Sequence, residues 1–85
     1  MTKDELLTKI KNERLDKILL PWRIKFDKIS DSSLVIGCVK VDGKWQVFKT
    51  RERGGHYIVK AFDDENEAYD FFYESLEYLK RLSRY

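Results

Sequence analysis

The stretch LVIGCVKV-DG-KWQVFKT, residues 34–50, decides the fold. Two runs rich in β-branched and aromatic residues flank Asp42-Gly43. An Asp-Gly pair between such runs is typical of a β-hairpin closed by a type I′ turn, because both central residues of that turn need positive φ. The stretch therefore predicts two antiparallel strands, over residues 34–41 and 44–51.

A two-residue loop also fixes the register, so that Gly37 pairs with Phe48 and the hairpin acquires two defined faces. The first face carries Leu34, Ile36, Cys38, Trp45 and Val47. The second face carries Val35, Val39, Val41 and Phe48, with Gln46 and Thr50 among them. Because the first face has the larger side chains, we assign it to the core. The second face is either covered by further structure or left for a partner.

Downstream of the hairpin, the residues predict one more strand and a helix. Residues 51–55 form a Gly-containing turn, and residues 56–62 a third strand in which Tyr57, Val59 and Ala61 alternate with Ile58, Lys60 and Phe62. A helix over residues 64–82 begins with a capping box formed by Asp64 and Glu67. Its apolar stripe consists of Ala68, Phe71, Phe72, Leu76, Leu79 and Leu82.

Upstream of the hairpin, Thr2 and Glu5 form a second capping box, which opens a helix predicted over residues 3–19. Residues 22–27 alternate apolar and polar side chains, a pattern that fits either an edge strand or an extended connection. The expected fold is α+β, one domain over residues 1–85. It has an N-terminal helix, an antiparallel meander of three or four strands, and a C-terminal helix packed on the sheet.

The composition argues against an enzyme. The chain has 85 residues, with one histidine, His56, and one cysteine, Cys38. So short a chain has little room for an enclosed cleft. We expect no catalytic residues, no cofactor and no metal site. A single cysteine fits a reducing cytoplasm, and no apolar run approaches the ~18 residues that span a membrane. The N-terminal residues do not have the pattern of a signal peptide.

The small net charge of +2 hides two oppositely charged parts. Residues 1–60 carry 14 Lys and Arg against eight Asp and Glu, whereas residues 61–85 carry three against seven. Steps of three and four place four of these acids on one face of the predicted C-terminal helix. This acidic stripe consists of Glu67, Asp70, Glu74 and Glu77, with Tyr73 beside it. It is either a solvated helix face or a contact face for a basic protein partner.

A second candidate contact face is the turn after the hairpin, with Arg51, Arg53, His56 and Tyr57. Basic and aromatic residues also suggest a different use, the binding of single-stranded nucleic acid by stacking and phosphate contacts. The residues for that alternative are Lys40, Lys44, Lys49, Arg51, Arg53, Lys60, Trp45, Phe48 and Tyr57. The first face predicted above buries Trp45, and no RNP-like motif is present, so nucleic acid is the less favoured partner.

Residues 40–79 contain three short motifs: a Gly-Lys-Trp hairpin, a Glu-Arg-Gly turn and a Phe-x-x-Glu-x-Glu-Ala start of the final helix, in that order. In this chain they are Asp42–Phe48, Glu52–Gly54, and Phe62, Asp64, Glu65, Glu67 and Ala68, followed by Phe71-Phe72. Through these motifs the chain resembles the small bacterial immunity proteins of polymorphic-toxin systems.

The resemblance implies a non-enzymatic cytoplasmic protein that binds a cognate bacterial toxin directly, one to one, and neutralises it. Inhibitors of nucleases are often acidic, whereas the isoelectric point here is about 8.7. Two alternatives stay open: a small nucleic-acid-binding regulator and a phage-encoded inhibitor of another protein target. The sequence leaves the oligomeric state open.

Overall fold

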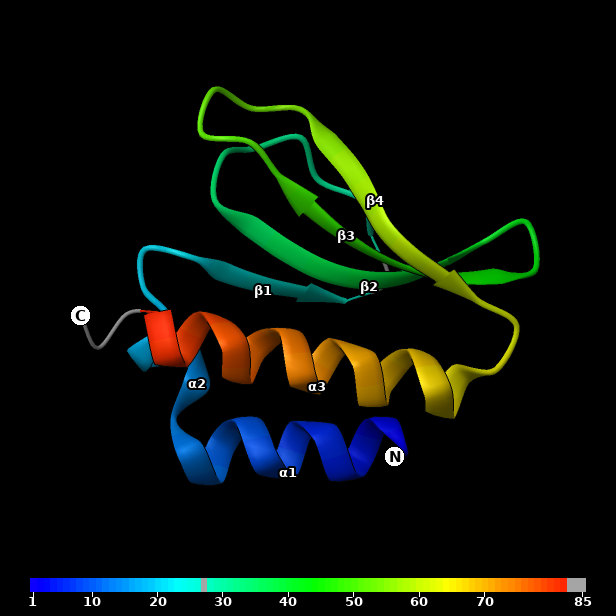
Figure 1. Ribbon diagram of the computed structural model, residues 1–85, viewed down its shortest axis with the longest axis horizontal. Helices are drawn as coiled ribbons and strands as arrows, with labels where there is room; N and C mark the ends of the chain where they lie inside the picture. The colour runs from blue at the N-terminus through cyan, green and yellow to red at the C-terminus, as the bar shows by residue number, and fades with distance from the viewer. Residues whose placement is uncertain (27, 83–85) are drawn as a thin grey trace.

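The computed structural model, which describes residues 1–26 and 28–82, has a layer of helices on one face of a four-stranded sheet (Figure 1). The helices are α1 (Lys3–Glu13), α2 (Leu15–Ile18) and α3 (Glu65–Leu82). The strands, in their order across the sheet, are β1 (Arg23–Phe26), β2 (Val35–Val41), β3 (Lys44–Thr50) and β4 (His56–Phe62). Helix α3 packs on β2, β3 and β4, and α1 runs beside α3 in the same direction. The α+β class is confirmed.

The central hairpin has the predicted register. Val41 pairs with Lys44 and Gly37 with Phe48. The turn between β2 and β3 has φ of 50° at Asp42 and 80° at Gly43, both in the left-handed region that a type I′ turn requires. The loop therefore sets which side chains of both strands face the helices.

The main core lies between the helices and the predicted inner face of the sheet. Ile36, Cys38 and Val47 from the sheet are buried together with residues of all three helices. The helical members are Leu6, Ile10, Leu15, Leu19, Ala68, Tyr69, Phe72 and Leu76, although Leu19 directly follows α2. On the opposite face, Val35, Val39 and Phe48 form a small second cluster.

The first helix is not continuous over residues 3–19, as the pattern predicted. It opens with the expected Thr2–Glu5 capping box, and α1 then ends at Glu13, followed by the C-cap residue Arg14, which has a φ of 55°. The reason is the five-residue step from Ile10 to Leu15, which in one continuous helix rotates Leu15 by about 140° away from Ile10. The break at Arg14 turns Leu15 back toward the core, where its side chain is fully buried.

The strand pairing also differs from an all-antiparallel meander, because β1 pairs with β2 in parallel. The alternation of residues 22–27 does form a strand, and residue 27 lies outside the described residues. Trp22, Ile24 and Phe26 pack on the core. Leu34, predicted on the core face of the next strand, instead precedes β2 with a φ of 58°, and its carbonyl oxygen accepts a hydrogen bond from the Arg23 amide at 2.9 Å.

Strict alternation along the third predicted strand is interrupted by a β-bulge. Lys60 pairs with Val47, but Ile58 pairs with Phe48, so Val59 is an extra residue without a partner on β3. Cross-strand partners share a face, so Lys60 lies on the helix side of the sheet and Ile58 on the other side. The bulge falls on β4, an edge strand, where bulges are common because they increase the local twist.

Candidate protein-interaction site

The acidic stripe is divided by its contacts with α1. The amino group of Met1 lies 2.5 Å from the Asp70 carboxylate and 3.3 Å from the carbonyl oxygen of Asn66. The Tyr73 hydroxyl donates a hydrogen bond to Glu13 Oε2 near the end of α1. Asp70 and Tyr73, two residues of the predicted contact face, are therefore already in contact with the N-terminal part of the chain.

Two carboxylates meet at this helix contact. The side chain of Glu77 faces Glu13, and the hydrogen bond with Glu77, followed by those with Tyr73 and Lys80, lowers the pKa of Glu13 to about 2. The contact with Glu13, together with burial, raises the pKa of Glu77 above its ordinary value. Glu77 Oε1 is buried and has no hydrogen-bond partner among the described residues. A hydrogen bond between two carboxyl groups needs a proton, which two ionised carboxylates lack. The contact between Glu13 and Glu77 is therefore favourable when Glu77 is protonated.

The outer edge of the stripe remains accessible. Glu67 and Glu74 are exposed, whereas Tyr73 and Glu77 are half-buried. Of the five stripe residues proposed as a contact face, the structure leaves two fully directed to solvent without an ion pair among the described residues.

The second predicted face lies at the end of the β3–β4 hairpin, away from the helix layer (Figure 1). The turn is closed by two backbone hydrogen bonds, from the Gly54 amide to the Arg51 carbonyl at 2.9 Å and from the Arg51 amide to the Gly55 carbonyl at 3.0 Å. Both glycines have positive φ, 89° and 82°. The side chains of Arg51 and Arg53 are exposed. The turn thus presents two guanidinium groups to solvent.

Large apolar side chains at the start of the edge strand β4 are exposed, and one of them, Tyr57, adjoins the turn. Tyr57, Ile58 and Val59 are 41%, 40% and 40% exposed, high values for large apolar side chains. The Arg51 guanidinium lies 5.2 Å from the centre of the Tyr57 ring, a cation–π distance. We call Arg51, Arg53 and Tyr57 the hairpin-end surface, because Ile58, the partner of Phe48, projects from the opposite face of the sheet. His56, the fourth residue predicted at this turn, is half-buried behind it.

His56 is held by Asp31, a residue that the sequence reading did not single out. Asp31 Oδ1 accepts a hydrogen bond from the His56 amide at 3.1 Å and lies 2.6 Å from His56 Nδ1. The hydrogen bond with the His56 ring is the main cause of the lowered pKa of Asp31. The polar side chains of residues 30–33 are typical of a turn, and only the fold brings that turn to β4. The His56 ring stands edge-on to Phe48, with ring centres 6.2 Å apart.

The residues that the nucleic-acid alternative requires do not form one platform. Phe48 is fully buried, and Trp45 is half-buried against Tyr69, which leaves Tyr57 as the one exposed aromatic of the three. The cations are also dispersed. Lys40 lies over Trp45, Lys44 pairs with Asp63, and Lys60 lies over Phe62 and Phe71.

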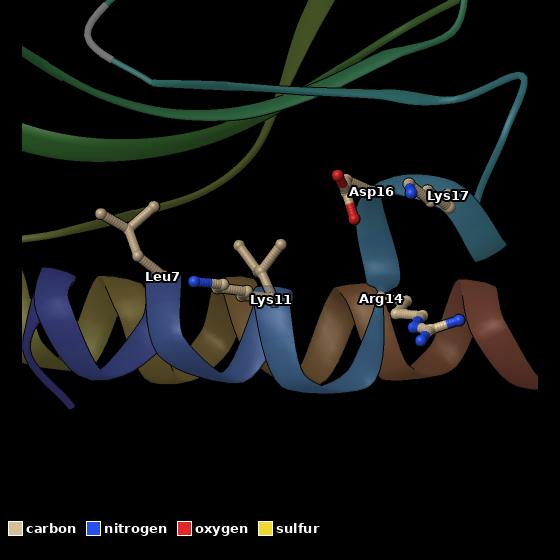
Figure 2. A pocket seen from close by; sticks show the side chains of 6 residues that line it. Leu7, Lys11, Arg14, Asp16 and Lys17 are labelled. Atoms are coloured by element: carbon tan, nitrogen blue, oxygen red, sulfur yellow. The ribbon is translucent and has the colours of Figure 1, made fainter.

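A surface hollow of about 420 Å³ lies at the junction of α1 and α2 (Figure 2). Its lining consists of Leu7, Ile10, Lys11, Arg14, Asp16 and Lys17. Figure 2 shows Lys11 and Arg14 directed toward opposite ends of the hollow, so these cations do not converge on one point. The hollow therefore does not have the geometry of an anion site.

A second groove, of about 390 Å³, lies between the α2–β1 connection and the end of α3. Its lining consists of Leu19, Leu20, Pro21, Trp22, Leu79 and Leu82. The side chains are apolar apart from the Trp22 indole, so the groove offers no acid–base or nucleophilic chemistry. It accounts for the exposure of Leu20 and Leu82.

Comparison with protein-family models, with curated proteins and with solved structures gives no match to this chain. Over residues 1–26 and 28–82, no three His, Cys, Asp or Glu side chains gather as metal ligands would. Within the same part of the chain, none of the helices combines the length and the apolar character needed to cross a bilayer.

Proposed function

We propose that this chain is a non-enzymatic protein-binding inhibitor, an immunity protein that neutralises a cognate bacterial toxin in the cytoplasm by direct 1:1 binding. The observation that carries the proposal is the hairpin-end surface, where the Arg51 guanidinium lies over the exposed Tyr57 ring and Arg53 is exposed in the same turn. The resemblance of residues 40–79 to immunity proteins supports the same class.

The chemistry of the hairpin-end surface suits a protein partner. Arg and Tyr are enriched among the residues that dominate binding energy in protein interfaces, because each offers a large, semi-rigid contact area and polar groups. Arg51 and Arg53 favour an acidic patch on the toxin, and Tyr57 supplies the apolar contact. Such a pairing gives fast, salt-sensitive association. The exposed acids Glu67 and Glu74 form a second, separate face.

The direct test uses the toxin domain encoded beside the gene for this chain. Isothermal titration of that domain with the wild-type chain is expected to give 1:1 binding. Tyr57→Ala is expected to weaken binding by tenfold or more, as the loss of an interface anchor does. Tyr78→Ala is the matched control, because Tyr78 is also exposed, at 52%, but lies on α3. Equal losses in the two variants would exclude the hairpin-end surface, and absence of wild-type binding would exclude the proposed function.

A further inference from the structure

Asp31 ties the β3–β4 turn to a different part of the chain. Its carboxylate accepts the His56 amide and contacts the His56 ring, and its carbonyl oxygen accepts the Gly55 amide at 2.8 Å. Among the described residues, Asp31 is the one residue outside the hairpin that forms hydrogen bonds with residues 51–56. Asp31 lies in the connection that leads into β2, and His56 is the first residue of β4. The bonds therefore reach past the end of β3, which lies between these two strands, and connect the middle of the sheet to its edge strand.

The close approach of Asp31 requires the glycines of the turn. A Cβ atom on Gly54 would lie 3.0 Å from the Asp31 carbonyl oxygen, and Gly54 and Gly55 both have positive φ. The turn is thus shaped to fit against Asp31 and is closed by the Arg51–Gly55 hydrogen bond. β4 is an edge strand paired with β3, so the Asp31 bonds add order at an end of the sheet where the edge strand has no second neighbour.

We propose that Asp31 is a positioning residue that holds the hairpin-end surface in the conformation that the partner binds. This inference rests on the proposed function. His56 lies between the tethered Gly55 and Tyr57, so the Asp31 contacts fix the backbone that carries both the Arg51 and the Tyr57 side chains. A preformed surface avoids the entropy cost of ordering the turn on binding. Without the Asp31 carboxylate, that cost falls on the binding step.

The test compares Asp31→Ala with Asp31→Asn, which keeps a side-chain oxygen for the His56 amide. Asp16→Ala, at an exposed aspartate of α2, is the control. Amide hydrogen exchange in the free protein and binding kinetics with the adjacent-gene toxin domain are measured well below the unfolding temperature. Asp31→Ala is expected to lose protection at Gly55 and His56 and to weaken binding about tenfold, in line with the entropy of ordering a short segment. Asp31→Asn is expected to recover most of both.

The outcomes separate the two proposals. Unchanged exchange in Asp31→Ala, or lost protection with wild-type affinity, would overturn the positioning role and leave the proposed function standing. If Asp31→Ala does not fold, amide exchange in the wild type decides: protection at the Gly55 and His56 amides would support the role, and exchange as fast as in an unstructured chain would overturn it. Failure of the wild-type chain to bind the toxin domain would overturn the proposed function, and with it the role in binding.

Discussion

The ring of Phe48 lies across the backbone of Gly37, its partner on the neighbouring strand. A Cβ atom on Gly37 would come within 2.4 Å of Phe48 Cε1 and 2.9 Å of the Lys25 carbonyl oxygen. Phe48 is fully buried in this way although it lies on the sheet face opposite the helices. Gly37 is therefore required for space, since its φ is not in the left-handed region.

Gly37→Ala is expected to lower the free energy of unfolding by about 1–3 kcal/mol, the usual cost of overpacking a core. Phe48→Leu in the Gly37→Ala background is expected to recover part of that loss, because the smaller side chain leaves room for the new methyl group. Urea denaturation of the single and double variants measures both effects as a double-mutant cycle.

Gly43→Ala is the matched control for this prediction. No atom lies within 4 Å of a Cβ at Gly43, and its cost comes from a φ of 80°. Its destabilisation should therefore be the same with Phe48 or Leu at position 48. An additive cycle for Gly37 and Phe48 would show that the steric contact does not limit stability.

The sequence predicts best where local chemistry alone sets the geometry. The Asp42-Gly43 loop gives the register of β2 and β3, because positive φ at both positions leaves few alternatives. The end of β4 and the end of α3 also fall where expected, at Phe62 and Leu82. These features depend on residues within a few positions of one another.

The errors arise where tertiary contacts decide. The five-residue step between Ile10 and Leu15 was visible in the sequence and signals the break at Arg14. The sequence has no such signal for the parallel pairing of β1. The polar residues 30–33 fit the tight turn of an antiparallel hairpin as well as a longer loop that brings the chain back for a parallel strand. The sequence likewise gives no sign of which proposed contact face already has partners within the chain. Only the packing of α1 shows that Asp70 and Glu77 already have contacts within the chain.

Glu77→Gln is expected to stabilise the protein by about 1 kcal/mol at pH 8, because an amide donates a hydrogen bond to the Glu13 carboxylate without needing a proton. In the wild type the raised pKa of Glu77 means that the folded state holds more protons than the unfolded state between pH 4.5 and that raised pKa. The free energy of unfolding therefore falls as pH rises through this window.

Urea denaturation at several pH values checks this expectation, and Glu74→Gln is the control at an exposed position of the same helix. The slope between pH 4.5 and neutrality should flatten in Glu77→Gln and persist in Glu74→Gln. The contribution of Glu13, whose pKa is about 2, has the opposite sign and is lost as pH falls from 4.5 toward 2. A wild-type slope in Glu77→Gln would assign the titration to other groups.

Single-stranded oligonucleotides are expected to show no binding at about 50 mM salt, a condition that favours phosphate contacts. The reason is that Phe48 is fully buried and Trp45 is half-buried against Tyr69, which leaves Tyr57 as the exposed stacking ring of the predicted set. Fluorescence anisotropy with labelled DNA and RNA measures this. A salt-dependent shift that disappears in Tyr57→Ala would instead favour the nucleic-acid-binding function.

Charge reversal is expected to distinguish the two contact faces of the proposed complex. Arg51→Glu with Arg53→Glu should slow association with the toxin domain by about tenfold or more at low salt, because it replaces attraction with repulsion at the first encounter. Glu67→Lys with Glu74→Lys, which changes the same number of exposed charges on α3, should leave the association rate nearly unchanged.

Stopped-flow mixing at two ionic strengths measures both rates. The effect on the arginine pair should shrink at high salt, since salt screens exposed charges that are more than about 8 Å apart at physiological ionic strength. Slower association only in the Glu67 and Glu74 variant would place the contact on the acidic stripe, with a basic partner.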